Sequence, residues 1–223
     1  MTPHTHHARD RRARFVVVLD ADSTLIENEA IELLAEEAGT LDHVAAVTER
    51  AMRGEIDFEA SLRERVATLR GLPASVFETV GPRIRPTRGV EELIDGVHAA
   101  ASVVGVVSGG FHELLDPVAE RLGVDLWRAN RLEVVDGRLT GGLVGPVVDA
   151  AVKAASLLEW AADAGVPTAQ TIAIGDGAND LLMMREAGLS VAFNAKPAVC
   201  EQASLAAGRV DLSDILPLLG LRG

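Results

Sequence analysis

The stretch Phe15-Val-Val-Val-Leu-Asp-Ala-Asp-Ser-Thr24 decides the fold. Its first half is a β-branched run that stops at Asp20, which is typical of a strand buried on both faces of a parallel sheet. Similar runs lead into Ser108-Gly-Gly110 and into Gly175-Asp-Gly177, and a segment with helical character follows each of them. Alternating strands and helices predict βαβ units, and therefore a doubly wound α/β fold with a mostly parallel, Rossmann-like sheet. In such folds ligands bind at the carboxyl ends of the strands.

About 80 residues separate the first strand from the next one, which is too many for an ordinary crossover connection. Residues 28–86 have helical periodicity and no convincing strand, so we expect them to form a helical cap over the carboxyl edge of the sheet. Residues 15–27 and 87–223 would then form the catalytic core. Within that core, Asp136-Gly137 between apolar residues predicts a small β-hairpin.

The first 14 residues hold His4, His6 and His7 but no apolar stretch that could serve as a signal peptide. We expect a disordered tail. A weak metal site at the three histidines is the alternative interpretation, and it is disfavoured because nothing rigid holds them together.

The composition excludes several classes of protein. With 21 basic against 33 acidic residues, the formal charge of −12 argues against nucleic acid as a partner. No apolar stretch approaches the roughly 20 residues that a membrane-spanning helix needs. The single cysteine, Cys200, excludes an intramolecular disulfide and a zinc site of several thiolates, so we expect a cytoplasmic location and a Cys200 that packs as a small apolar side chain.

Asp20 and Asp22 emerge together at the end of a buried strand, separated by one residue. One carboxylate at such a place can attack phosphorus to form an aspartyl-phosphate. A second carboxyl, its pKa raised by the neighbouring charge, can carry a proton to the leaving oxygen. A turn rich in Asp and Ser, which is common after strands, is the competing interpretation, and this motif alone does not decide between them.

Gly175-Asp-Gly-Ala-Asn-Asp180 adds carboxylates at another strand end. Acids gathered in one crevice repel one another unless a cation joins them, and Mg²⁺ is the ion that suits such oxygen ligands. The alternative is a dinucleotide fingerprint, because Gly175 and Gly177 fit its first two glycines. Asp180 stands at the third position, where a carboxylate would oppose a pyrophosphate, so we rank that alternative low.

Two weaker signals complete the set. Ser108-Gly109-Gly110 offers a hydroxyl and bare backbone N–H groups that can cradle phosphate oxygens, although most such sequences are merely turns. Lys153 opens a predicted helix at Ala154–Ala162 and could neutralise a transferring phosphoryl group, although a solvated lysine is the commoner case. The order of the motifs is more specific than any one of them.

This order resembles that of the haloacid dehalogenase-like hydrolases and, in detail, the group among them that hydrolyses phosphoserine. The resemblance runs from about residue 15 to 215 and rests on the motifs LDADSTLIENE at 19–29, AMRGEIDF at 51–58, SLRER at 61–65, VSGGF at 107–111, ANRL at 129–132, DGRLTG at 136–141 and GDGAND at 175–180.

The resemblance implies a Mg²⁺-dependent phosphomonoesterase that releases L-serine and phosphate from O-phospho-L-serine, the last step of serine biosynthesis. It implies that Asp20 is the nucleophile and Asp22 the acid and base, and that Mg²⁺ is held by Asp20, the backbone carbonyl of Asp22 and Asp176. The other implied residues are Ser108, Gly109 and Lys153 for the phosphoryl group, Asn179 for the substrate, Asp180 in a supporting role, Glu29 for the substrate ammonium, Arg65 for its carboxylate, and Met52 and Phe58 for the pocket wall.

Spacing alone does not select the two recognition residues. Arg65 is one of several arginines in the cap, and Glu29 stands near Glu27 and Glu32. An arginine does match a substrate carboxylate with two parallel hydrogen bonds. The resemblance also implies a minimal version of the enzyme, without the amino-terminal regulatory domain of some relatives and without that control. We expect a monomer or a homodimer.

Two other functions stay open at this point. A related phosphatase or phosphotransferase acting on another small phosphate ester would keep the core residues with a different cap. A non-catalytic binding module would keep the fold, and it is disfavoured because every reactive position is filled.

Overall fold

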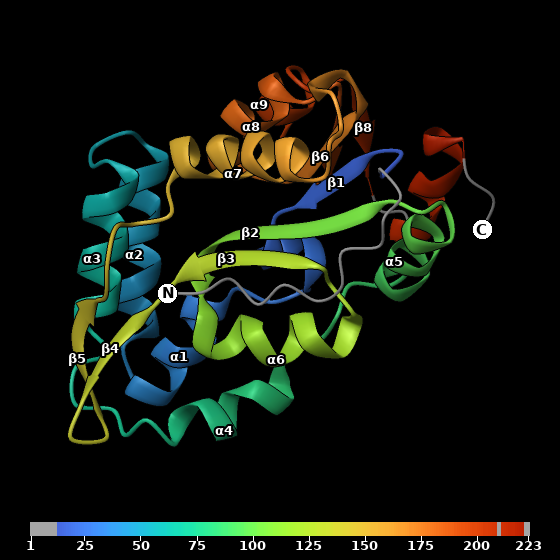
Figure 1. Ribbon diagram of the computed structural model, residues 1–223. Coiled ribbons are helices and arrows are strands. Elements are labelled where there is room, and N and C mark those ends of the chain that lie inside the picture. The colour runs from blue at the N-terminus through green and yellow to red at the C-terminus, as the bar shows by residue number, and fades with distance from the viewer. Residues whose placement is uncertain (1–12, 209–210, 221–223) are drawn as a thin grey trace.

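Six parallel strands form a central sheet in the order β3-β2-β1-β6-β7-β8 (Figure 1). The computed structural model describes residues 13–208 and 211–220, so the predicted tail site at His4, His6 and His7 lies outside the described residues. Within those ranges no helix is both long enough and apolar enough to cross a bilayer. The strands are β1 (Val16–Leu19), β2 (Val103–Phe111), β3 (Leu126–Asn130), β6 (Thr171–Gly175), β7 (Leu189–Phe193) and β8 (Leu205–Ala207).

The central strand β1 lies between β2 and β6, so the polar motifs at the ends of these three strands lie at one edge of the sheet. Its residues Val16–Leu19 pair in step with Val103–Val106 on one side and with Thr171–Ile174 on the other. Because these strands are parallel and in register, the segments that follow them leave at the same edge. The predicted doubly wound, parallel sheet is confirmed.

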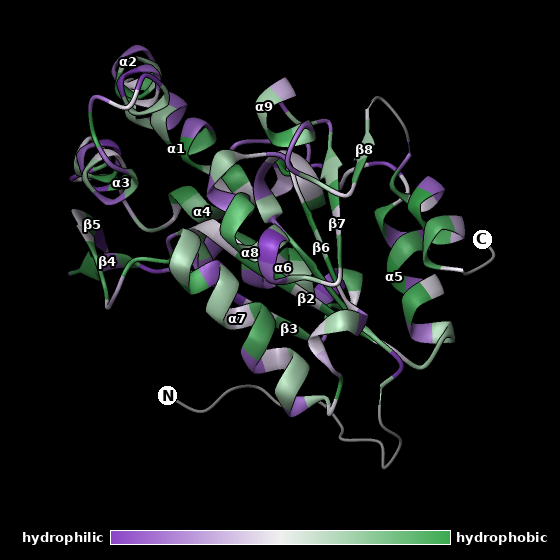
Figure 2. Cartoon of the chain, turned by 90° about the horizontal axis from the view of Figure 1, so that it is seen from above, coloured by the Kyte–Doolittle hydropathy of each residue, from purple (hydrophilic) through white to green (hydrophobic). Residues whose placement is uncertain are grey.

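Helices cover both faces of the sheet (Figures 1 and 2). Val17 belongs to the same apolar cluster as Leu93 on one face, and Val18 to the same cluster as Leu157 on the other. Cys200 packs against this second cluster as a half-buried side chain, as predicted. The helices are α5 (Val90–Ala99), α6 (His112–Leu122) and η5 (Leu212–Leu219) on the first face, and α7 (Ala150–Asp163), α8 (Leu181–Glu186) and α9 (Pro197–Cys200) on the second.

A helical insertion follows β1 and places α1 to α3 beyond the carboxyl ends of β2 and β3 (Figure 1). Local signals set its helix ends. The first helix stops at Gly39, whose φ of 67° is the left-handed conformation that ends helices, and the third begins after Asp57, whose carboxylate accepts from Ala60 N. The insertion contains α1 (Ala30–Ala38), α2 (Leu41–Met52), α3 (Phe58–Ala67), α4 (Val76–Val80) and the short turn η2 (Gly81–Arg83).

The predicted hairpin forms from β4 (Leu132–Val135) and β5 (Arg138–Leu143). Its turn residues Asp136 and Gly137 have φ values of 50° and 72°, as a two-residue turn of this kind requires. The hairpin docks on the insertion, because Gly71 N donates to Leu139 O at 2.8 Å. This docking was not predicted, and it adds the hairpin to the layer that covers the carboxyl edge.

The helix that contains Lys153 begins earlier than predicted. Asp149 caps it by accepting from Val152 N at 2.9 Å, so α7 starts at Ala150 and not at Ala154. Lys153 therefore lies inside the first turns of the helix, where its side chain is fully buried. The alternative of a solvated lysine at a helix start is wrong.

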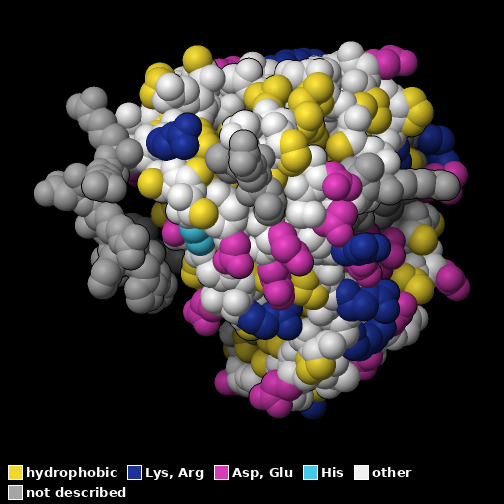
Figure 3. All heavy atoms as spheres, turned by 90° about the vertical axis from the view of Figure 1, so that its right-hand side faces the viewer, with side chains coloured by type: hydrophobic (Ala, Val, Ile, Leu, Met, Phe, Trp, Pro, Cys, Tyr) yellow, Lys and Arg dark blue, Asp and Glu magenta, His cyan; other side chains and the backbone are white. Residues whose placement is uncertain are grey.

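The end of the molecule that lies away from the insertion has a mixed surface. Figure 3 shows acidic and basic side chains beside one another on this face.

A histidine pair gives the fold a pH-dependent contribution. His98 Nε2 on α5 lies 2.8 Å from Asp125 Oδ2, which also accepts from Val104 N on β2. The hydrogen bond to Asp125 raises the pKa of His98, and the charge of Asp125 acts in the same direction against partial burial. The stabilisation is thus fully present below the unfolded pKa of about 6.5, and it is lost as the pH rises through the higher folded value.

We expect His98→Gln to lower the melting temperature more at about pH 5.5 than at about pH 9, by an amount equivalent to less than about 1 kcal/mol because the pair is partly exposed. Thermal melts of both chains at the two pH values measure this. An equal loss at both values would contradict a contribution from the protonated imidazole.

Candidate active site

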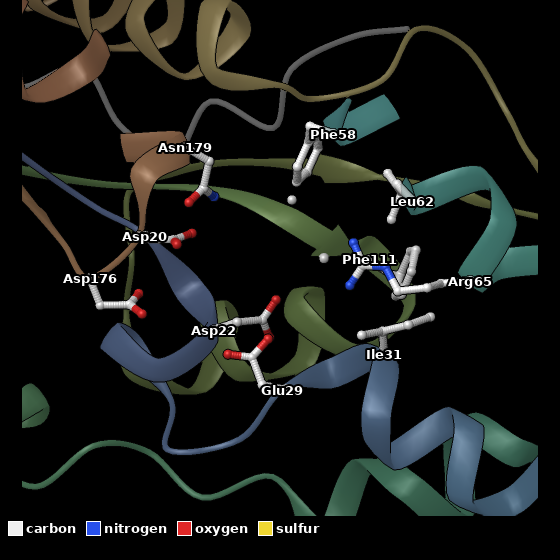
Figure 4. A pocket seen from close by; sticks show the side chains of 13 residues that line it. Asp20, Asp22, Glu29, Ile31, Phe58, Leu62, Arg65, Phe111, Asp176 and Asn179 are labelled. Carbon is white, nitrogen blue, oxygen red and sulfur yellow. The ribbon is translucent and has the colours of Figure 1, made fainter. Parts of the chain in front are cut away.

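Three strand ends meet the insertion around a cavity of about 110 Å³ (Figure 4). β1 leads into Asp20 and the turn η1 (Ala21–Leu25), β2 ends in the glycine-rich motif, and β6 leads through Asp176 into η4 (Ala178–Asp180). Helices α1 and α3 supply the opposite wall. The lining residues are Asp20, Asp22, Glu29, Ile31, Phe58, Leu62, Arg65, Gly109, Gly110, Phe111, Asp176, Gly177 and Asn179.

A buried lysine joins two carboxylates behind the cavity. Lys153 Nζ lies 2.6 Å from Asp20 Oδ1 and 2.7 Å from Asp180 Oδ1. Burial alone would lower the pKa of Lys153, but the charges of Asp180 and Asp20 outweigh it and raise that pKa. The ammonium therefore stays charged and fixes Asp20, whose Oδ1 also accepts from Ala21 N at 2.7 Å.

The carboxylates around this lysine form a group that could hold a metal ion. One oxygen each from Asp20, Asp176 and Asp180 lies within 4.8 Å of the others. Burial, and next the charge of Asp180, raises the pKa of Asp20 well above its usual range and that of Asp176 to about 6. Asp180 is already used by the protein, because its second oxygen accepts from Gly177 N at 3.0 Å. Asp20 and Asp176 are the members that line the cavity.

The dinucleotide alternative fails on the position of Asp180. Its carboxylate lies against Gly175, where even a Cβ would collide with it. The close approach that the fingerprint reserves for a pyrophosphate is therefore filled by a negative charge.

Asp22 stands beside Asp20 and differs from it in environment. Its Oδ1 accepts from Ala30 N at the start of α1, at 3.0 Å. Burial, followed by repulsion from Glu29, raises the pKa of Asp22 to about 7. A carboxyl with this pKa exchanges its proton near neutral pH, which is what a general acid and base needs.

Gly109 and Gly110, at the end of β2, are packed too tightly for a side chain at either position. A Cβ at Gly109 would lie 2.9 Å from the Phe58 ring, and one at Gly110 would lie 2.8 Å from Asp22 Oδ2. Ser108 is buried, and its Oγ accepts from Gly110 N at 2.8 Å. The two glycines line the cavity directly, and Ser108 stands behind them.

The structure separates Arg65 from the other arginines of the insertion. Arg50 pairs with Glu64 and Arg63 with Glu59, both at the surface. Arg65 lines the cavity, and its guanidinium points into it (Figure 4). Burial lowers the pKa of Arg65, although nearby carboxylates act in the opposite direction.

The structure also separates Glu29 from the neighbouring Glu27. Glu27 lies 3.3 Å from Arg85 at the surface, whereas Glu29 lines the cavity opposite Arg65 (Figure 4). Phe58 lines it too. Met52 does not, because its side chain is 63% exposed and its sulfur lies 3.4 Å from Lys196 Nζ.

Two residues that support the site had no predicted role. Buried Asn130 donates to Gly109 O and accepts from Val148 N, both at 2.8 Å, so it ties the glycine-rich motif to the segment leading into α7. Buried Thr24 donates to Asp176 Oδ1 at 3.3 Å. Asn130 lies in a motif that carries the family resemblance, which is the one signal that could have pointed to it.

Comparison with known proteins agrees with this geometry. A model of the haloacid dehalogenase-like hydrolase family matches residues 17–185. A phosphoserine phosphatase of Streptococcus thermophilus is 52% identical over 204 residues, which are 92% of this chain and 95% of that protein. A phosphoserine phosphatase of Streptomyces coelicolor is 55% identical over 211 residues, 95% of this chain but only 52% of that longer protein.

A solved structure has the same arrangement. It is described as a phospho-aspartyl intermediate analogue of phosphoserine phosphatase, and it superposes with a TM-score of 0.88 at 42% identity. The match covers 93% of this chain and 99% of the other.

The buried lysine gives a stability prediction. Lys153→Met leaves Asp20 and Asp180 buried without their counter-charge, so we expect the free energy of unfolding at neutral pH to fall by about 3–5 kcal/mol. Denaturant unfolding measures this change. Lys196→Met, at an exposed lysine, is the matched control and should stay within about 0.5 kcal/mol of the parent. Equal stability of the two variants would contradict the buried network.

Proposed function

Because the chain belongs to the haloacid dehalogenase-like hydrolase family, we propose that it hydrolyses O-phospho-L-serine to L-serine and phosphate. One observation carries this proposal. A single cavity joins a buried aspartate held by Lys153 to Glu29 and Arg65, which face each other across it (Figure 4). The first half suits a phosphoryl group, and the second suits the ammonium and carboxylate of an amino acid.

We assign the first chemical step to Asp20 and Asp22. The Asp20 carboxylate attacks phosphorus in line while Asp22 gives its proton to the seryl oxygen, so that the phosphorus–oxygen bond to serine breaks and an aspartyl-phosphate forms. The proton matters because an alkoxide is a poor leaving group. The pKa of about 7 at Asp22 supports this assignment.

In the second step Asp22 takes a proton from a water molecule. The water attacks the phosphorus of the aspartyl-phosphate, which releases phosphate and restores the Asp20 carboxylate. Asp22 thus returns to its starting protonation state, and the same group serves as acid and then as base.

The donor set fits Mg²⁺. Asp20, the backbone carbonyl of Asp22 and Asp176 would hold the ion, since hard oxygen ligands are those it prefers. When bound, it supplies positive charge that lets a phosphate dianion enter a crevice of aspartates. Asp180 keeps its place as a supporting residue, bonded to Lys153.

The phosphoryl oxygens would be bound by three groups at the strand ends. These are the hydroxyl of Ser108, the backbone N–H of Gly109 and the ammonium of Lys153, helped by the side-chain amide of Asn179. The position of Gly109 on the cavity wall supports this assignment, because a ligand in the cavity can approach its backbone there.

Recognition of the serine part falls to residues 28–86, which we propose to act as the cap over the core formed by residues 15–27 and 87–223. Glu29 would bind the ammonium and Arg65 the carboxylate, with Phe58 as an apolar wall. Met52, exposed in this structure, does not line the cavity, so the proposed recognition does not use it.

The reaction is the last step of serine biosynthesis. We place the enzyme in the cytoplasm, because its one cysteine suits a reducing compartment. We propose that the enzyme is a monomer or a homodimer.

The proposed function predicts Mg²⁺-dependent release of phosphate from phosphoserine. We expect Asp20→Asn to abolish that release without loss of the folded state, because an amide cannot supply the attacking carboxylate. Asp42→Asn, at an exposed helix position, is the control and should keep full activity. A phosphate assay over a panel of esters, with and without a chelator, measures this. A stronger preference for another ester, or substantial activity of Asp20→Asn, would overturn the proposal.

Arg65 gives a test of recognition. Loss of a charge-assisted contact costs about 1.5–3 kcal/mol. We therefore expect Arg65→Ala to raise KM for phosphoserine at least about tenfold, and to raise KM far less for phenyl phosphate, which has no carboxylate. Arg63→Ala, two residues away on the same helix and paired at the surface, is the matched control. An equal effect of Arg65→Ala on both substrates would remove Arg65 from substrate recognition.

A further inference from the structure

Ser23 adopts a strained backbone conformation in the middle of the turn η1, which follows β1. Its φ of 57° and ψ of 4° lie in the left-handed region, which disfavours residues with a Cβ and which glycine adopts freely. The turn imposes this conformation, since Ser23 N donates to Asn28 O at 3.3 Å and Ile26 N to Ala21 O at 3.0 Å. Strain of this kind clusters at functional sites, which raises the question of what the serine side chain does there.

The Ser23 hydroxyl holds Glu29. Its Oγ donates to Glu29 Oε1 at 2.7 Å, the hydrogen bond that the described residues provide to this carboxylate. Glu29 precedes α1 at the N-cap position, yet its side chain does not cap the helix. Asp22 bonds to Ala30 N instead, so the Glu29 carboxylate is free to face the cavity (Figure 4).

Glu29 has a strong alternative partner in Arg65. The two side chains face each other across the cavity, and the charge of Glu29 acts on the guanidinium (Figure 4). Even so, within the described part of the chain no carboxylate oxygen lies within 4.0 Å of the Arg65 nitrogens. Opposite charges in a partly buried cavity attract each other, and the hydrogen bond from Ser23 is a contact that holds Glu29 in the separated position.

We propose that Ser23 is a positioning residue that anchors the Glu29 carboxylate away from Arg65. The anchor keeps the two side chains as separate binding points for the ammonium and the carboxylate of one amino-acid substrate. Without it, Glu29 closes onto Arg65, and the resulting ion pair occupies both points at once. This inference rests on the proposed function, because it concerns the same recognition site.

Two variants of Ser23 separate the hydroxyl from the backbone strain. Ser23→Ala removes the hydroxyl and keeps the Cβ, whereas Ser23→Gly removes the hydroxyl and relieves the strain. We expect both to lower the ratio of kcat/KM for phosphoserine to kcat/KM for phenyl phosphate roughly tenfold, mainly through KM. Thermal melts confirm folding, and Ser75→Ala, at an exposed serine outside the cavity, is the matched control. A ratio preserved in either variant overturns the inference.

A double-mutant cycle tests whether Ser23 acts through Glu29. In a Glu29→Ala background there is no carboxylate to anchor, so adding Ser23→Ala should change the ratio no further. If instead the two losses multiply, Ser23 acts on something other than Glu29 and the inference is wrong.

The two proposals fail in different ways. A parent chain that does not hydrolyse phosphoserine refutes the proposed function, while a parent that does, with selectivity intact in the Ser23 variants, refutes this inference alone.

Discussion

The pairing of one buried ammonium with two buried carboxylates is the interaction on which the site depends. Lys153 comes from a helix on one face of the sheet, Asp20 from the end of β1, and Asp180 from the turn after β6. Each charge would be costly to bury alone, and the shared ammonium offsets part of the cost of burying both carboxylates. The network therefore holds three segments that are distant in the sequence together at one point and fixes Asp20 there.

This network leaves an excess of negative charge at the site, which favours the binding of a cation. One ammonium faces the carboxylates of Asp20, Asp22, Asp176 and Asp180, and burial raises the pKa of the three that line the cavity. A divalent cation relieves that repulsion. In the proposed function the chemistry lies on the sheet edge and recognition on the insertion, to which the β4–β5 hairpin is attached by backbone hydrogen bonds. The proposal thus assigns reaction and specificity to separate layers.

The sequence predicted the features that depend on neighbouring residues, namely the strands and the places where they end. β-Branched runs that stop at Asp20, Ser108 and Asp176 indicate buried parallel strands, and parallel strands bring their ends together. Tertiary packing determined the features that the sequence did not predict. Asp149 caps α7, so the helix starts earlier than expected and Lys153 lies buried within it. Arg50 and Arg63 pair with surface glutamates and do not line the cavity. Neither the exposure of Met52 nor the left-handed conformation of Ser23 leaves a trace in residue spacing.

The central claim is that Asp20, held by Lys153, attacks phosphorus and becomes covalently phosphorylated. The most direct measurement is rapid acid quenching during turnover of phosphoserine, followed by mass spectrometry of the proteolysed chain. The account predicts a phosphoryl group on Asp20 that appears before free phosphate and decays when substrate is exhausted. Phosphate release with no phosphorylated residue, or with the phosphoryl group on another side chain, would contradict it.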